Sequence, residues 1–453
     1  MLGWRILEYG EYRLDLPRLS EEEEAAIKRI SEKFREVTRN ESTASKEHGT
    51  LIIKKLLEEY CQENKIYLDR GQTEYLSKMA YLDLYGLAFI EQLLADEGIE
   101  EISIINVNKP AYVYLRNKGW KSVNACFTDT KALAEVVNKM ARALGRHITV
   151  QNPRLDAMLS DGSRLHASMP PISNGELTIR KFREKPFSPN ELCENATLNA
   201  RALAYLSLLM QGDNSLLVAG NTASGKTTTL NALFSFVPAN ERIIITEETP
   251  EINIPHRHQL RLIANKEMGI TLKSLVYDSL RMRPDRMIVG EIRNEEEAEA
   301  LFDVLLAGQA RGSYATMHAQ STDEVIQRLL SFGVSRMDIN SIDCVIVQRR
   351  MLTYSMKKKQ NVEIRRIVSI SEIGEKTNTI FSYNSKTNKL EECMESRLLQ
   401  GVANSFGAEL AAVKEEMKRR EKLFHGFAMD APGFYNNVQK EFYGLKGTSH
   451  EEY

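Results

Sequence analysis

One motif limits what this chain can fold into more than any other feature: an unbroken G-x4-G-K-T between Gly220 and Thr227. A strand-like apolar run, SLLVA, precedes the motif, and a helix-like run, TTTLNALFSF, follows it. In that context the glycines let successive backbone N–H groups turn toward one point, where the helix N-terminus favours negative charge. The motif therefore predicts a phosphate-binding loop between a strand and a helix.

The side chains of this loop suit a magnesium-bound triphosphate. Lys226 is expected to reach the β- and γ-phosphates, and the hydroxyl of Thr227 is expected to ligate Mg2+. A chance match in a strand-to-helix turn is the alternative, and the acidic strands downstream argue against it. The predicted nucleotide-binding residues are Gly220, Asn221, Thr222, Ala223, Ser224, Gly225, Lys226, Thr227 and Thr228.

Two apolar strands downstream end in carboxylates. One runs from Arg286 to Glu291, and a carboxylate at its end is placed to join the magnesium shell or to hold the attacking water. The other, Arg242 to Thr246, is followed by Glu247 and Glu248. Because adjacent acids repel each other, one of this pair is a candidate to polarise water while the other contacts metal or a neighbour. A cap of a turn is the alternative role for Glu247.

A histidine follows the next strand, Ser313 to Thr316. This strand comes after the acidic strand Arg286 to Glu291 in the chain. His318 at its end would therefore lie near the γ-phosphate and act as a sensor of it. A structural histidine with satisfied hydrogen bonds is the alternative. Glu251, four residues beyond Glu247, is expected at the surface.

The order of apolar runs predicts the domain organisation. Strands alternate with helices from about residue 190, which is typical of a parallel sheet covered by helices. The five expected strands are Ser215 to Ala219, Arg242 to Thr246, Arg286 to Val289, Ser313 to Thr316 and Ile342 to Gln348. Before that lies a small α/β segment with a hairpin signal at Asn108-Lys109-Pro110 and a loop-rich stretch, 152–171. Ser20 is expected to cap a helix near the N-terminus. The expected parts are a helical extension at 1–95, an α/β domain at 96–186, a P-loop core at 187–375, and a polar helical tail at 376–453. The tail is expected to contain a charged helix from Glu409 to Phe424.

Composition excludes several other classes of protein. Lys and Arg number 60 and Asp and Glu 62, so the net charge of −2 argues against a protein held to nucleic acid by bulk charge. The five cysteines form no CxxC pair, which disfavours a disulfide framework or a zinc ribbon and fits a reducing compartment. No apolar run approaches the ~18 residues that span a bilayer, and no signal peptide is readable, so a cytosolic or peripheral protein is expected.

The four motifs, in this order, resemble the secretion and pilus ATPase superfamily, the motors of type II and type IV secretion, type IV pili and the archaeal flagellum. The matching blocks are the phosphate loop, an Asp box (TEETPE), an acidic strand box (RPDRMIVGEIRNEE) and a His box (SYATMHA). EETPEINIPH and the DGSR turn are most similar to archaeal members, including the archaellum motor and archaeal secretion ATPases. The resemblance covers residues 85 to 370, approximately.

The resemblance implies an N-terminal sensor-like α/β domain, a RecA-like core, a ring of six subunits, and ATP with Mg2+ as cofactors. It assigns catalytic positions to Glu247, Glu291 and His318. In the family, arginines of the N-terminal domain and arginines after the Asp box reach bound nucleotide across subunits. The corresponding stretches here hold Arg154, Arg164, Arg257 and Arg261.

The sequence departs from the family pattern at three points. The Asp box carries Glu247-Glu248 where the family usually has Glu-Asp. Ala310 and Arg311 stand where a Gly-His pair commonly opens the His box. The four-cysteine zinc module of some bacterial members is absent from the sequence.

The implied function is an ATP-hydrolysing hexameric motor for pilus- or archaellum-like filament assembly or for protein secretion. Such a motor would work at the cytoplasmic face of the membrane against a multi-span platform protein, with no direct contact to nucleic acid. Two alternatives stay open: a nucleic-acid motor on the same core, and a scaffold that binds nucleotide without hydrolysing it.

Overall fold

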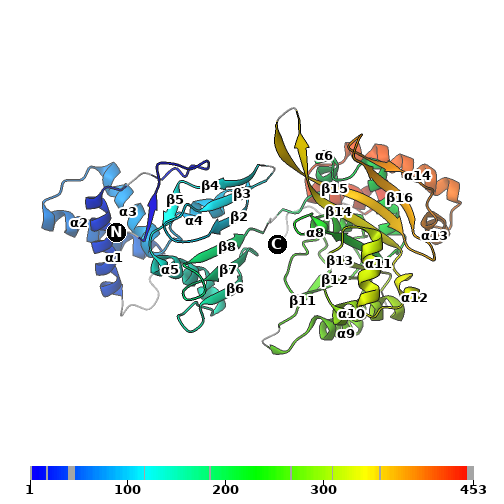
Figure 1. Cartoon of the computed structure of the whole chain (residues 1–453), viewed down its shortest axis with the longest axis horizontal. Helices are drawn as coiled ribbons and strands as arrows, with labels where there is room; N and C mark the ends of the chain where they lie inside the picture. The colour runs from blue at the N-terminus through cyan, green and yellow to red at the C-terminus, as the bar shows by residue number, and fades with distance from the viewer. Residues whose placement is uncertain are drawn as a thin grey trace. The chain divides into compact units, whose positions relative to one another are not determined.

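The computed structural model describes residues 3–16, 19–38, 46–116, 118–182, 185–265, 268–308, 310–356 and 359–445. These residues form two compact units, Met1–Glu184 and Lys185–Tyr453 (Figure 1). The expected helical extension falls in the same unit as the small α/β segment, and the expected tail falls in the same unit as the P-loop core. Within the described ranges, no helix combines the length and apolarity needed to cross a membrane.

The first unit begins with a bundle of helices. Ser20 accepts a hydrogen bond from the N–H of Glu23 and donates its own N–H to the carboxylate of Glu23, so the predicted N-cap is confirmed. The following helix buries Ile27, Ile30 and Phe34, which recur on one face, against its neighbours. The helices are α1 (Glu21–Val37), α2 (Lys46–Asn64), α3 (Arg70–Leu84) and the short α4 (Ile90–Ala95).

A six-stranded antiparallel sheet completes this unit, in the order β4-β3-β2-β8-β7-β6. The side chains on its inner face pack in one hydrophobic cluster with α5 (Thr130–Ala141). A separate pair, β1 (Trp4–Ile6) and β5 (Ala125–Phe127), lies beside it. The strands of the sheet are β2 (Ile99–Ile104), β3 (Tyr112–Leu115), β4 (Gly119–Ser122), β6 (Arg154–Met158), β7 (Arg164–Ser168) and β8 (Glu176–Arg180).

The stretch 152–171, expected to be loop-rich, instead contains the hairpin of β6 and β7. Five residues of each strand pair across it, and the turn carries Asp161 and Gly162. Gly162 adopts a φ of 82°, which glycine tolerates without strain. The prediction failed because Leu155, Ala157, Leu165 and Ala167 are apolar at every second position only, a short alternation that proline and charged neighbours obscure.

The second unit is built on a nine-stranded sheet in the order β11-β10-β12-β13-β9-β14-β15-β16-β17. The first six strands in this order are parallel and the last three are antiparallel. All five strands predicted for the core are present, which confirms the RecA-like α/β class. The strands are β9 (Leu216–Gly220), β10 (Ile243–Glu247), β11 (Gln259–Ile263), β12 (Arg286–Ile292), β13 (Gly312–Met317), β14 (Cys344–Ser355), β15 (Gln360–Glu372), β16 (Asn378–Asn384) and β17 (Lys389–Glu392).

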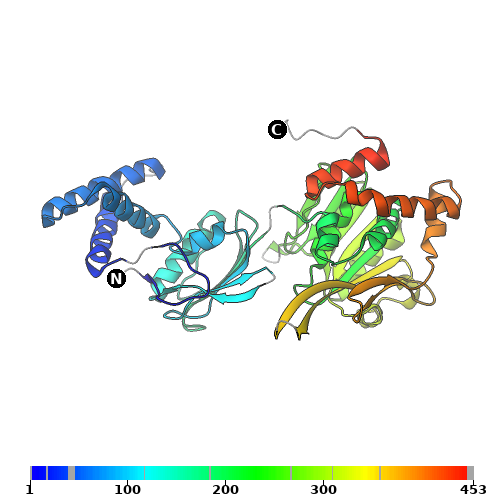
Figure 2. The same cartoon turned by 90° about the horizontal axis from the view of Figure 1, so that it is seen from above.

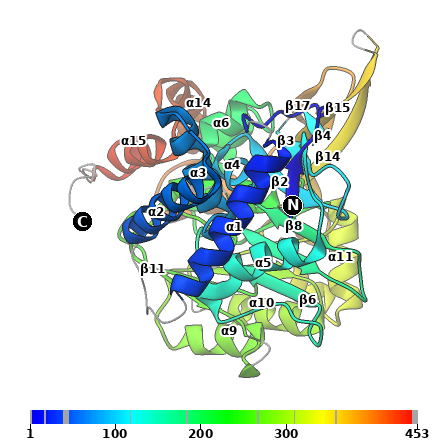
Figure 3. The same cartoon turned by 90° about the vertical axis from the view of Figure 1, so that its left-hand side faces the viewer.

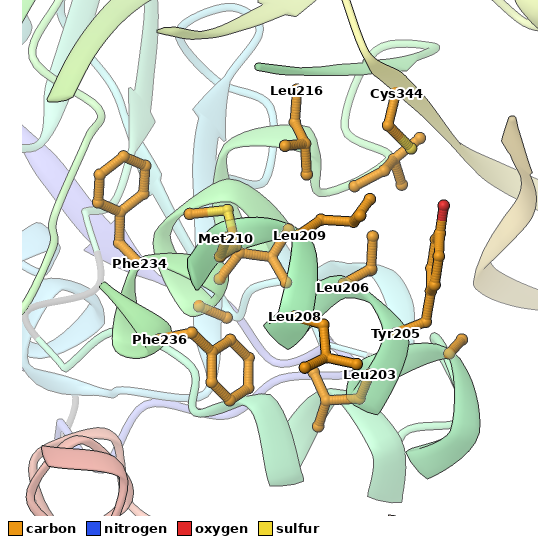
Figure 4. Packing of buried hydrophobic residues seen from close by; sticks show 14 of the residues in the cluster. Leu203, Tyr205, Leu206, Leu208, Leu209, Met210, Leu216, Phe234, Phe236 and Cys344 are labelled. Carbon is orange, nitrogen blue, oxygen red and sulfur yellow. The ribbon is translucent and has the colours of Figure 1, made fainter. Parts of the chain in front are cut away.

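Helices cover both faces of this sheet, so its central strands are apolar throughout. Leu216 and Val218 face one hydrophobic cluster, whereas Leu217 and Ala219 face the other. Figure 4 shows α7 side chains such as Leu209 gathered with Leu216 in the first cluster. The helices of the core are α6 (Pro189–Glu194), α7 (Ala200–Gln211), α8 (Lys226–Leu233), α9 (Leu272–Leu280), α10 (Glu295–Ala307), α11 (Thr322–Ser331) and α12 (Arg336–Ile339).

The C-terminal segment packs onto the core instead of forming a polar tail. Phe424 and Phe434 are buried beside Phe236, in the same cluster as α7. Figure 2 shows the C-terminal helices, in orange and red, lying against the rest of the second unit. Two strands here, β16 and β17, were not predicted, while the helix expected from Glu409 to Phe424 is present. The helices are α13 (Leu398–Ser405), α14 (Leu410–Leu423) and α15 (Ala431–Tyr443).

Candidate functional site

The predicted phosphate loop joins β9 to α8. Gly225 holds a left-handed φ of 96° at the residue before α8 begins, which lets the loop turn into the helix. A Cβ on Gly220 would lie 2.0 Å from the carbonyl oxygen of Gln348, and one on Gly225 would lie 2.9 Å from its Nε2. The two glycines therefore leave room only for backbone where the chain passes β14, and the N-terminus of α8 opens beside them.

Residues of β14 and β15 support the loop from behind. Asn221 Nδ2 donates to the carbonyl of Arg350 at 3.0 Å, and Asn221 Oδ1 accepts from its N–H at 2.8 Å. Arg365 Nε donates to the carbonyl of Ala223 at 3.0 Å, and Thr229 Oγ1 donates to Gln348 Oε1 at 2.5 Å. Sequence reasoning missed these supports, since they lie more than a hundred residues beyond the loop.

Three charged or titratable side chains meet at the end of this loop. Lys226 Nζ is buried and lies 3.3 Å from the carbonyl of Gly220, 3.4 Å from His318 Nδ1 and 3.8 Å from Glu291 Oε1. His318 Nε2 lies 3.0 Å from the same Glu291 oxygen. Burial, and secondly the charge of Lys226, lower the pKa of His318, while Glu291 opposes that shift. The predicted lysine, acid and histidine thus lie together.

Arg293 adds a second cation that the sequence reading did not single out. Its Nε donates to Glu291 Oε2 at 2.8 Å, and its NH1 donates to Glu248 Oε2 at 2.5 Å. Its N–H donates to Glu297 Oε2 at 2.6 Å, and burial raises the pKa of Glu297. Arg293 therefore links the ends of the two acidic strands. The position of Arg293, two residues after Glu291, is the sequence signal that could have identified it.

Glu247 lies buried at the end of β10. Its Oε1 accepts the N–H groups of Glu251 and Ile252, both at 2.8 Å. Its Oε2 has no hydrogen-bond partner in the described residues and lies 3.4 Å from Arg261 Nε. Burial raises the pKa of Glu247 to about 7, against the opposing effect of these N–H groups and Arg261. A carboxyl held in this way exchanges protons near neutrality.

Glu251 was expected at the surface, and it is exposed. Its carboxylate nevertheless contacts the phosphate loop, because Thr227 Oγ1 donates to Glu251 Oε2 at 3.2 Å. The hydroxyl predicted to ligate magnesium is therefore beside an acidic oxygen. This proximity follows from the chain turning back after β10, which the spacing of the acids does not reveal.

The four arginines predicted to act across subunits occupy different settings. Arg154 and Arg164 lie on the exposed face of the β6–β7–β8 sheet, since their neighbours in sequence point into the core. Arg257 is exposed. Arg261 contacts its own chain, at Glu247 and the carbonyl of Ile252. Arg311, at the expected first His-box position, lies at the opposite end of the sheet and pairs with Asp213 and Glu241.

The residues present fit a nucleotide with magnesium. The backbone turn that only glycine allows, the start of α8 and the buried Lys226 suit phosphate oxygens. The hydroxyl of Thr227 and the carboxylates of Glu251 and Glu291 are oxygen donors, the ligands that Mg2+ prefers.

A comparison with protein families decides the relationship. The profile described as Type II/IV secretion system protein matches residues 83–423, well over half of the chain. This chain belongs to the type II/IV secretion system protein family. The match extends beyond residue 370, where the resemblance in the sequence ended, and so includes β16, β17 and α14.

Individual relatives agree with this membership. An uncharacterised protein of Methanocaldococcus jannaschii is 37% identical over 234 residues, which are 49% of this chain and 32% of that protein. A second uncharacterised protein of this organism is 31% identical over 376 residues, 82% of this chain and 65% of that protein. The archaeal type that was predicted is thereby supported. This chain spans less than two thirds of the length of either relative.

A solved structure is similar in fold to this chain. The X-ray structure of the Legionella pneumophila ATPase DotB is 13% identical and covers 79% of this chain and 90% of its own, with a TM-score of 0.45.

Proposed function

We propose that this secretion-family protein hydrolyses ATP with Mg2+ and works as a hexameric motor for filament assembly or protein secretion. One observation carries the proposal: Lys226 of the phosphate loop, Glu291 at the end of β12 and His318 after β13 contact one another. A phosphate-binding lysine next to a carboxylate at the end of a neighbouring strand is an arrangement that P-loop NTPases use to hydrolyse triphosphates. The family to which the chain belongs supports the coupling to secretion.

Each residue then has a defined part in hydrolysis. Lys226 and the loop N–H groups hold the β- and γ-phosphate oxygens. Thr227 and Glu291 would hold Mg2+ when it is bound, and the ion would supply charge stabilisation for the phosphate oxygens. Glu247 orients water and accepts its proton, for which a pKa near 7 is suitable. His318 reports the γ-phosphate, because its ring lies 3.4 Å from Lys226 Nζ.

Oligomerisation would complete the pocket. Arg154 and Arg164 belong to the first unit and are exposed, so they are accessible to the nucleotide bound by a second copy of the chain. Arg257 is also exposed, whereas Arg261 has to release Glu247 before it can reach a neighbour. Loss of the γ-phosphate would weaken these contacts and let the subunits shift, as in other nucleotide switches. The motor would act at the cytoplasmic face of the membrane on a multi-span platform protein.

The experiment is a measurement of phosphate release and oligomeric state by the full-length protein. With ATP and Mg2+ we expect turnover and a six-subunit particle, and EDTA should stop the turnover. Added DNA should leave the rate unchanged, since a nucleic-acid motor would instead be stimulated. Bound nucleotide without phosphate release, in a stable ring, would favour the scaffold and overturn the proposal.

A further inference from the structure

Part of the hairpin formed by β14 and β15 leaves the sheet. β9 pairs with β14 only as far as Gln348, and β16 pairs with β15 only from Ser369 onward. Beyond these points residues 349–355 pair only with residues 360–366, in register, among the described strands. This two-stranded segment, with Met356 and Lys359 at its end, is called the ribbon here. It projects from the second unit in Figures 1 and 3.

The free end of the ribbon carries large apolar side chains in solvent. Leu352, Tyr354 and Met356 are 69%, 62% and 84% exposed. Leu352 and Tyr354 lie on one face of the ribbon, because side chains alternate along a strand. Met356 is the first residue after β14 ends at Ser355. A row of this kind on a projecting element marks an interaction site. A ribbon of two strands also gains little stability from its own pairing.

The ribbon is basic, although the chain is not. The sequence from Arg349 to Arg366 holds seven basic residues and one acid, Glu363, a net charge of +6 against −2 for the whole chain. The arginines at its root have partners, such as Arg350 and Arg365 with Glu363. Three consecutive lysines follow Met356 in the sequence, and the last, Lys359, is exposed. The charge of Lys359 is therefore exposed at the same free end as the apolar row.

We propose that the ribbon inserts its apolar row into an anionic lipid surface, with Lys359 on the headgroups. Anionic lipid attracts polybasic segments, and a tyrosine ring is favoured at the boundary between headgroups and acyl chains. The apolar residues stand on a narrow projection. A lipid surface admits such a projection without a matching shape, whereas a protein partner would have to provide a groove.

The test is sedimentation of full-length, nucleotide-free protein with lipid vesicles. Vesicles with about one third phosphatidylserine should bind the protein, and pure phosphatidylcholine vesicles should bind it at least ten-fold more weakly. Replacing both Leu352 and Met356 with Ser should lower the partition coefficient about ten-fold. Lys359→Glu should lower it by a similar factor, since it exchanges attraction for repulsion, and added salt should weaken binding.

Matched controls separate the ribbon from general surface effects. Met337→Ser removes a methionine that is 83% exposed on α12, and Lys386→Glu reverses a charge in the β16–β17 turn. Both should bind as the wild type does. Equal loss in controls and ribbon variants, or unchanged binding in the ribbon variants, would overturn the proposal. A ribbon that binds protein but no vesicle would also overturn it. Because no nucleotide is present, either result leaves the hydrolysis proposal untouched.

Discussion

Charged side chains are buried both at the N-terminal and at the C-terminal ends of the parallel strands in the nine-stranded sheet. The two ends differ in how completely these charges are paired. At the N-terminal ends of the strands, Arg286 is fully buried and donates to Glu241 at 2.6 Å, Asp213 at 2.7 Å and the hydroxyl of Tyr314 at 3.0 Å. Arg311 donates to the same two acids. Burial works against the charge of Arg286, yet Tyr314, Glu241 and Asp213 raise its pKa above the ordinary value. Every side chain of this network has a close partner.

The charged side chains at the C-terminal ends of the strands are paired less completely. Lys226 meets its neighbours at 3.3 to 3.8 Å, and one oxygen of Glu247 has no hydrogen-bond partner in the described residues. The pKa of Glu247 is raised to about 7 and that of His318 is lowered. Shifts of this kind collect where a site handles protons or a charged ligand. The N-terminal ends of the strands therefore fix the sheet, whereas the C-terminal ends keep bonding capacity for a ligand.

The largest expected effect comes from the loosely paired end. Lys226→Ala should reduce Mg-ATP turnover by roughly 10³-fold and abolish nucleotide binding, because it removes the ammonium that is expected to hold the β- and γ-phosphates. Phosphate release and calorimetric titration measure the two quantities. The melting temperature should change little. Normal turnover in this variant would show that the loop is not the catalytic phosphate site.

The paired end should respond in stability instead. Arg286→Met should lower the free energy of unfolding of the second unit by about 3–5 kcal/mol, because it leaves the buried carboxylate of Glu241 without its main partner. Urea denaturation measures this loss. The matched variant Arg311→Met removes a cation that is 53% exposed, and solvent screening limits its cost to at most about 1 kcal/mol. Equal losses in both variants would contradict the contrast between buried and exposed partners.

The raised pKa of Glu247 gives a pH dependence of known sign. The folded pKa lies above that of the unfolded chain, so the stabilising contribution of protonated Glu247 is present below about pH 4.5 and is lost as the pH rises through about 7. Glu247→Gln should therefore stabilise the protein by about 3 kcal/mol at pH 8 and have little effect at pH 4. Thermal unfolding at the two pH values measures this, and a pH-independent difference would refute it.

The rate of turnover should also depend on the ionisation of Glu247, but it should be highest where Glu247 is ionised. A carboxylate that accepts a proton from water must be ionised, so the rate should fall as the pH drops below about 7. In Glu247→Gln this acidic limb should disappear along with most of the activity. A pH–rate profile of both proteins checks the assignment.

The smallest effect is expected from the clamp between the acidic strands. Arg293→Met removes the hydrogen bonds that Arg293 donates to Glu291 at 2.8 Å and to Glu248 at 2.5 Å. Turnover should fall about ten-fold, with nucleotide affinity nearly unchanged, because the acids lose their orientation and the loop does not. Steady-state kinetics and nucleotide titration measure both. A loss of affinity without a loss of rate would place Arg293 on the nucleotide instead.

The sequence predicted what lies in continuous stretches. The strand–loop–helix of the phosphate site, the five parallel strands and the meeting of Lys226, Glu291 and His318 follow from apolar runs that end in polar residues. The supports of the loop could not be predicted, because Gln348, Arg350 and Arg365 approach it only through strand pairing. The same reason hid β16 and β17, whose polar outer faces resemble a tail. Arg293, by contrast, was visible beside Glu291 and was overlooked.

The most direct test of the central claim compares binding with turnover in a single variant, Glu291→Gln. The substitution keeps the size of the side chain and removes the charge that contacts Lys226 and His318. We expect Mg-ATP binding close to that of the wild type together with loss of phosphate release. Wild-type turnover in Glu291→Gln would contradict a hydrolytic site at the end of β12.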